Sequence, residues 1–390
     1  MEFSGLERPN NLVGIRNTIL VMAAADCAEP VARMIAEGIE GAVSVSQYQG
    51  CIDMQVVPTL TGVARNANVF GTLLVAMGCE GQQPEPLKEE IAKSGKPVEI
   101  INIQAVGGTR RAISKGREIV RSMAEEAKRQ QRAPFDIGRL IVGVKCGGSD
   151  TTSGIAANPA IGVTTDMLVD AGAAVVMGEP IEAIGAEKAL SSRAENEEVR
   201  RQIMKWIGDE EKRWTVPGAA VDFMCRGNIE GGLTTLEEKS LGAIHKSGHR
   251  LIKGVLKNKD DYLETVPPGG GLFLQEGVHV ELHSMTYMAA AGVHLIIFTT
   301  GQGGSFGHAI SPLIKVTGNP DTWARMNEDM DINASTIMEG NESIESVGKR
   351  IFDEVLAVAS GKLTIGEQLG MYNFAIWKRD PRLEALLGLQ

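Results

Sequence analysis

The chain has 390 residues, of which 43% are hydrophobic and 23% are charged, and its formal net charge is −10. This length is too great for one ordinary hydrophobic core, so we expect a globular protein with two domains. The acidic balance argues against a nucleic-acid partner held through phosphate contacts. No apolar run approaches the roughly 20 residues that cross a bilayer, and the polar start MEFSGLERPNN is unlike a signal peptide.

The five cysteines, Cys27, Cys51, Cys79, Cys146 and Cys225, are widely spaced. Their odd number and the lack of a secretory pattern argue against a disulfide framework. We therefore expect free thiols in a protein of the reducing cytoplasm.

Short apolar runs alternate with helical stretches in the first third of the chain. The runs at 18–25, 69–77 and 98–103 are typical of buried strands, whereas 29–38 and 109–132 have helical periodicity. This alternation predicts parallel β-α units.

The same alternation returns after Ala133 and Pro134, which break a long charged helix. Strands are predicted at 140–144, 173–177 and 293–299, and helices at 158–171, 196–210, 234–247 and 343–360. We therefore expect an α/β protein with two Rossmann-like or flavodoxin-like parallel-sheet domains, the first over residues 1–133 and a catalytic one over residues 134–390.

Glycine turns with polar side chains follow several of these strands. They read GCE at 78–80, CGGSD at 146–150, GEP at 178–180 and TTGQGGS at 299–305. Ligands of open parallel sheets bind at the carboxyl ends of the strands, so these turns are the expected places for a site.

The CGGSD turn combines a thiol, a carboxylate and flexible backbone. The N–H groups of Gly147, Gly148 and Ser149 can form an anion nest, and Cys146 or Asp150 can ligate a metal or transfer a proton. The alternative interpretation is a tight turn around a buried thiol.

Two further segments carry candidate side chains. Glu179 and Glu182 can hold a divalent cation or transfer a proton, or they are simply acids at a solvated helix start. Thr234, Thr235 and Lys239 can bind a carboxylate at a helix N-terminus, or the two threonines simply cap that helix.

The glycine run at 301–305 lacks the lysine of a nucleotide-binding P-loop. We interpret it as a carboxylate nest that uses Gly301, Gly303 and Ser305.

The histidines lie late in the chain. His279, Glu281 and His283 alternate, as side chains on one face of an extended segment do, although a surface strand gives the same pattern. His245 and His249 are four residues apart, a spacing that suits zinc or, more simply, cations at a helix C-terminus.

The longer motifs resemble one enzyme family over nearly the whole chain. They are GIRNTILVMAAADC at 14–27, VAMGCEGQQ at 75–83, CGGSDTTSGIAANPAIG at 146–162, GGLTTLEEKSLGAI at 231–244 and FTTGQGGSFGHAISPLIKVTGNP at 298–320. In this order they resemble the altronate/galactarate dehydratase family. The resemblance implies a hydro-lyase that forms a 2-keto-3-deoxy acid by removing the α-proton and the β-hydroxyl of a sugar acid. It also implies a divalent metal cofactor, Fe2+ ahead of Mn2+ or Mg2+.

Members of that family carry a small additional N-terminal domain, so the resemblance implies a separate small subunit and a heteromeric assembly. This arrangement resembles (2R)-sulfolactate sulfo-lyase, a relative in the same family that expels sulfite. Release of sulfite and pyruvate is therefore the alternative reaction, and a non-catalytic sugar-acid-binding protein is the second alternative. In each case the ligand is a small anionic hydroxy acid.

The predicted site takes residues from both domains and converges on one pocket. Its catalytic residues are Cys146, Asp150, Glu179, Glu182 and Lys239. Its substrate contacts are Arg16, Asn17, Gly147, Gly148, Ser149, Thr234, Thr235, Gly301, Gly303 and Ser305. Its metal ligands are Cys51, Cys79, Cys146 and Glu179.

Overall fold

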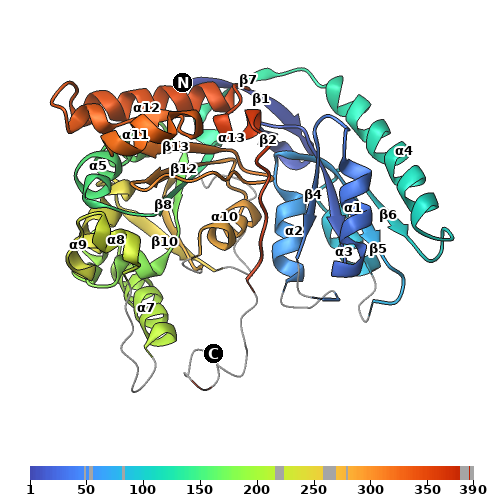
Figure 1. Cartoon of the computed structure of the whole chain (residues 1–390), viewed down its shortest axis with the longest axis horizontal. Helices are drawn as coiled ribbons and strands as arrows, with labels where there is room; N and C mark the ends of the chain where they lie inside the picture. Colours follow the sequence, from blue (N-terminus) through green and yellow to red (C-terminus); the bar gives the residue numbers. More distant parts are fainter. Residues whose placement is uncertain are drawn as a thin grey trace.

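The structure is a computed structural model that describes residues 1–47, 50–51, 56–80, 84–215, 224–257, 269–277, 280–377 and 386. It contains two parallel sheets, each with helices against both faces, and one small antiparallel sheet (Figure 1). This confirms the predicted α/β fold with two parallel-sheet units. None of the described helices is long and apolar enough to cross a membrane.

The first sheet has four parallel strands in the order β4-β3-β5-β6. The strands are β3 (Thr18–Ala23), β4 (Ala42–Ser46), β5 (Val69–Ala76) and β6 (Val98–Asn102), and the helices around them are α1 (Glu29–Ala36), α2 (Val57–Arg65), α3 (Pro84–Ala92) and α4 (Thr109–Lys128). Ile19 and Val21 of β3 pack towards α1 and α4, whereas Leu20 and Met22 pack towards α2 and α3. Because both faces are covered, β3 is apolar from Ile19 to Ala23, and each buried aliphatic side chain contributes about 1.5–3 kcal/mol.

The second sheet has seven parallel strands in the order β10-β11-β9-β8-β12-β13-β14. The strands are β8 (Ile141–Gly147), β9 (Ala174–Met177), β10 (Ile252–Leu256), β11 (Gly271–Gln275), β12 (Leu295–Thr300), β13 (Leu313–Thr317) and β14 (Ile332–Asn333). The helices are α5 (Asn158–Asp170), α6 (Glu187–Ser191), α7 (Glu197–Trp214), α8 (Arg226–Glu230), α9 (Leu236–Ile244), α10 (Glu281–Ala290), α11 (Pro320–Met326), α12 (Ile344–Ala359) and α13 (Ile365–Gln368). Helices α5, α7 and α12 cover one face and α10 covers the other.

The two units are joined by shared packing and by the small sheet. In that sheet β1 (Glu2–Arg8) pairs with β2 (Leu12–Gly14) and with β7 (Ala133–Asp136). Helix α10 lies against α2, between the two large sheets (Figure 1). The buried Asn68 amide donates to the carbonyl oxygens of His294 and Ile310 at 2.7 and 2.9 Å. A side chain of the first unit thus provides hydrogen bonds to buried backbone carbonyls of the second.

Each large sheet reverses its order between two adjacent strands. The chain leaves β3 towards β4 but leaves β5 towards β6, and it leaves β8 towards β9 but leaves β12 towards β13. Such switch points open a crevice at the carboxyl ends of the strands, where ligands bind in open α/β sheets.

One predicted element is wrong. Glu281 and His283 lie in the first turn of α10 rather than on an extended segment, and two residues that are two positions apart on a helix do not share a face. The packing of Met285 and Met288 against the second sheet explains the helix. His279 lies outside the described residues.

Candidate functional site

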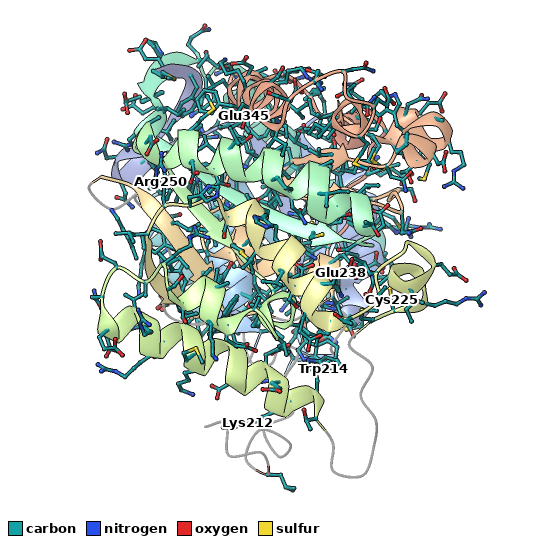
Figure 2. All side chains as sticks on the ribbon, turned by 90° about the vertical axis from the view of Figure 1, so that its left-hand side faces the viewer. Lys212, Trp214, Cys225, Glu238, Arg250 and Glu345 are labelled. Atoms are coloured by element: carbon teal, nitrogen blue, oxygen red, sulfur yellow. The ribbon has the colours of Figure 1, made fainter. Side chains whose placement is uncertain are left out.

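A cavity of about 350 Å³ lies at the carboxyl ends of β8 and β9. The predicted residues that line it are Cys146, Gly147, Gly148, Ser149, Glu179, Glu182 and Lys239. Trp214 at the end of α7 and Cys225 before α8 also line it, and both lie on the side of the molecule that Figure 2 shows. The structure therefore brings the CGGSD turn, the glutamates after β9 and the lysine of α9 together.

Glu179 is the most unusual residue of this cavity. Its backbone is left-handed, with φ 65° and ψ 77°, a conformation that costs a non-glycine residue about 1–3 kcal/mol and that is concentrated at functional sites. Its Oε1 accepts a hydrogen bond from Lys145 Nζ, while its Oε2 is buried and has no hydrogen-bond partner within the described part of the chain. Burial raises the pKa of Glu179 to about 8, although Lys145 opposes the shift. A carboxylate with this pKa can exchange a proton near neutral pH.

Glu182 forms a second buried ion pair beside the first. Its carboxylate accepts from Lys246 Nζ, and Lys246 is fully buried. Burial opposes ionisation of Glu182, but Lys246 and Lys145 together hold its pKa below the usual value. Glu182 therefore stays charged while Glu179 is partly protonated, a separation that assigns different roles to two neighbouring carboxyl groups.

Cys146 is buried at the end of β8, with its Sγ 2.8 Å from the hydroxyl of Ser149. Burial and the nearby charge of Glu182 raise the pKa of the Cys146 thiol. The group is therefore a neutral thiol at neutral pH, which suits proton donation better than metal ligation because ligands must be thiolates.

Asp150 fastens the turn instead of lining the cavity. Its Oδ1 accepts from the N–H and hydroxyl of Ser153, and its Oδ2 accepts from the amide of Asn319 at 2.7 Å. The carbonyl of Gly148 accepts from the N–H groups of Gly301 and Gln302, both at 3.1 Å. The two glycine turns thus meet behind the cavity wall.

Replacing Gly301 with alanine is expected to disturb this junction. A Cβ at that position would lie 2.1 Å from Asp150 Cγ, so the carboxylate must move, at a cost of about 1–3 kcal/mol of stability. Gly208→Ala is the matched control, because nothing surrounds its Cβ and alanine in a helix interior gains up to about 1 kcal/mol. Urea unfolding checks both, and equal stability of Gly301→Ala and the wild type would contradict the prediction.

Four other predicted contacts lie outside the cavity lining. Thr234 and Thr235 are exposed, and both bond to Glu238 at the start of α9, as the capping interpretation requires. The N–H of Gly303 donates to Thr300 Oγ1, and Ser305 is exposed.

Arg16 and Asn17 lie at the junction of the two units. Arg16 forms an ion pair with Glu367 at 2.6 Å and donates to the Val358 carbonyl. Asn17 Oδ1 accepts from Arg8. The Arg16 contacts join the two units, whereas Asn17 bonds within the first, and neither residue lines the cavity.

The predicted metal ligands are divided between the two sheets. Cys51 and Cys79 follow β4 and β5 of the first sheet, whereas Cys146 and Glu179 line the cavity at the second. Among the described residues, no three histidine, cysteine, aspartate or glutamate side chains are placed to hold one ion. The described residues of the cavity therefore do not by themselves form a ligand set for the expected divalent metal.

Sequence reasoning missed two buried lysines. Lys145 carried a signal, because a charged residue within an apolar strand needs a buried partner. No sequence pattern indicated that Lys246 is buried, because it stands in a short polar stretch. Only the folded structure brings it to Glu182.

Comparison with known proteins identifies related sequences for both units. The family model described as D-galactarate/Altronate dehydratase, C-terminal, matches residues 137–382. The model described as D-galactarate dehydratase/Altronate hydrolase, second domain, matches residues 5–128.

Curated relatives match most of the chain. The (2R)-sulfolactate sulfo-lyase subunit beta of Chromohalobacter salexigens is 33% identical over 384 residues, which are 96% of each chain. The altronate dehydratase of Bacillus subtilis is 30% identical over 96% of this chain and 77% of its own length. The galactarate dehydratase (L-threo-forming) of Escherichia coli is 34% identical over 82% of this chain and 62% of its own length.

Proposed function

Because the chain belongs to the galactarate/altronate dehydratase family, we propose that its cavity eliminates water from a sugar acid such as altronate or galactarate. The observation that carries this proposal is Glu179. Its unpartnered carboxylate oxygen, left-handed backbone and raised pKa coincide at the cavity wall. Each is expected of a general base.

The substrate carboxylate would bind at the backbone of Gly147, Gly148 and Ser149 and near Lys239. Ionised Glu179 takes the α-proton, and the electron pair of that C–H bond forms the enol double bond as the β-substituent leaves. A hydroxyl leaves as water when it receives a proton, for which the Cys146 thiol and the Ser149 hydroxyl are the donors at hand. The enol then takes a proton at the β-carbon to give the 2-keto-3-deoxy acid.

A second candidate reaction is release of sulfite from (2R)-sulfolactate. It is favoured by the sulfo-lyase subunit that aligns with this chain over 96% of both. Sulfite departs with the bonding electrons and needs no proton donor, so the same base would suffice, and pyruvate would be the product. The name of that relative, a beta subunit, also supports a separate small subunit as a partner of this chain.

The two reactions are separated by their products. The chain, alone and with any small protein that co-purifies with it, is incubated with altronate, galactarate or (2R)-sulfolactate, and keto acid and sulfite are measured. Keto acid without sulfite from a sugar acid supports the dehydratase, and sulfite from sulfolactate alone supports the second candidate. Binding of these acids without turnover would leave a sugar-acid-binding protein and overturn both.

The pH dependence of the reaction should follow Glu179. Since the base is the ionised form and its pKa is about 8, kcat/KM is expected to rise roughly tenfold per pH unit below about pH 8 and to level off above it. Steady-state rates measured from about pH 6 to about pH 9 check this, with unfolding followed over the same range. A flat profile below about pH 8 would contradict Glu179 as the base.

A further inference from the structure

Glu281 is an acidic residue of the cavity wall that the proposed reaction does not use. It lies in the first turn of α10 and lines the cavity together with Val280. The residue is half-buried, and its carboxylate has no hydrogen bond or ion pair with any residue that the structure describes. By contrast, the two acids after β9 are each paired with a buried lysine. The charge of Glu281 is therefore the one that a ligand in the cavity would meet uncompensated.

Helix α10 places Glu281 beside the proposed base. Gly178 immediately precedes Glu179 at the end of β9. A Cβ at Gly178 would lie 3.0 Å from Ser284 Oγ and 2.8 Å from Met288 Cε, so α10 packs closely against this turn. Ser284 is three residues after Glu281, and residues at this spacing are neighbours on a helix surface. Glu281 therefore enters the cavity next to the turn of Glu179.

The groups that would bind the substrate carboxylate approach the cavity from other elements. The glycine turn at 146–149 ends β8, and Lys239 lies on α9. Helices α9 and α10 pack against opposite faces of the second sheet (Figure 1). The strand order is β11-β9-β8, and the chain continues from β11 into α10. Glu179, at the end of β9, thus lies between the carboxylate-binding turn and Glu281.

This order across the sheet fixes how a sugar acid would lie in the cavity. Two strand spacings separate β8 from β11, about 10 Å in all, which is comparable to an extended six-carbon acid with its terminal oxygens. With the carboxylate at the β8 turn, the α-carbon lies near Glu179 and the last carbon lies near Glu281.

The charges of the wall suit a ligand with one carboxylate. Among the described lining residues, Lys239 is the single cationic side chain, and the proposed reaction assigns it to the carboxylate next to the α-carbon. A second carboxylate at the far end would face Glu281, and like charges brought together oppose binding. A terminal hydroxyl would instead donate a hydrogen bond to the Glu281 carboxylate.

We propose that Glu281 determines the substrate class. It selects sugar acids that carry one carboxylate and end in an alcohol, as altronate does, and it rejects diacids such as galactarate. This inference rests on the proposed function, because it takes the ligand to be a hydroxy acid whose α-carbon lies at Glu179. It goes further in assigning the choice between monoacid and diacid to one side chain.

Binding of matched acids tests this choice without turnover. Altronate and altrarate, like galactonate and galactarate, differ only in whether the last carbon is an alcohol or a carboxylate. Calorimetry on the full chain, with any small protein that co-purifies with it, should show each monoacid bound at least about tenfold more tightly than its diacid. Where an acid is turned over, kcat/KM replaces the dissociation constant, and the same ratios are expected.

Two variants at the same position should change these ratios in a graded way. Glu281→Gln should tighten binding of the diacids and bring each pair to within about threefold, because the repulsion is gone while an oxygen that accepts from a hydroxyl remains. Glu281→Lys should reverse the preference. The matched control is Glu237→Gln, which also removes one acidic charge, but from an exposed residue of α9 that does not line the cavity. It should keep the wild-type ratios.

Thermal unfolding of each variant shows whether it is folded. A wild type that binds diacids as tightly as monoacids would overturn the inference. So would a Glu281→Gln variant with unchanged ratios and lowered stability, because Glu281 would then serve only as an acid at a helix N-terminus. Both results leave the proposed function standing. That function fails separately if the wild type binds these acids but forms no keto acid, and the binding ratios then still decide the role of Glu281.

Discussion

Replacing Glu179 with glutamine is expected to lower kcat by about 10²–10⁴-fold, the range that a general base contributes. Glutamine keeps the shape of the side chain and an oxygen that accepts from Lys145, but it cannot take a proton from carbon. The fold should survive, because the raised pKa of about 8 means that wild-type Glu179 is mostly uncharged at neutral pH. Glutamine resembles that uncharged form.

The matched control is Glu187→Gln, a nearby acid that does not line the cavity and caps the turn at Gly185. It should keep wild-type turnover. Keto-acid release measured at saturating substrate, together with urea unfolding of both variants, checks the pair. Full activity of Glu179→Gln would remove this residue from the reaction, and a large loss of stability would show that its role is structural.

The strands that sequence reasoning found are those buried on both faces. β3, β5 and β8 are buried along their whole length and are mostly apolar, because helices cover both sides of each sheet. β1 was missed, because Glu2 and Glu7 face solvent while Phe3 and Leu6 are buried, and its partner β7 is more than a hundred residues away. Neither the hydrophobic pattern nor the strand propensity of a segment predicts pairing with a segment so far away in the chain.

The candidate site was partly predictable for a related reason. Turns after parallel strands must lie at one edge of the sheet, so the turn at Cys146 and the acids at Glu179 and Glu182 could be expected to meet. The sequence does not show which of the two sheets a turn belongs to, because this depends on the topology. The prediction therefore grouped Cys51 and Cys79, which follow strands of the first sheet, with Cys146 and Glu179 at the second.

Replacing Lys246 with methionine should have the largest effect on stability. Lys246 is fully buried and Glu182 is 5% exposed, and the two residues are 64 positions apart in the chain. Removing the lysine leaves a buried carboxylate without its partner, at an expected cost of about 3–5 kcal/mol. The control is Lys349→Met, which breaks the exposed pair with Asp353 on α12 and should cost less than about 1 kcal/mol.

The double variant Lys246→Met with Glu182→Leu distinguishes two causes of the lost stability. One is the loss of the ion-pair attraction, and the other is the burial of an unpaired Glu182 carboxylate. If the cost of Lys246→Met comes from the unpaired Glu182 carboxylate, removing that carboxylate as well should restore part of the lost stability. The pKa of Glu182 is held low chiefly by Lys246 against burial, so the single variant should lose more stability as pH rises and the stranded acid must ionise. Urea unfolding at about pH 5 and about pH 8 measures this. Additive losses in the double variant, with no pH dependence in the single one, would mean that the pair contributes through packing alone.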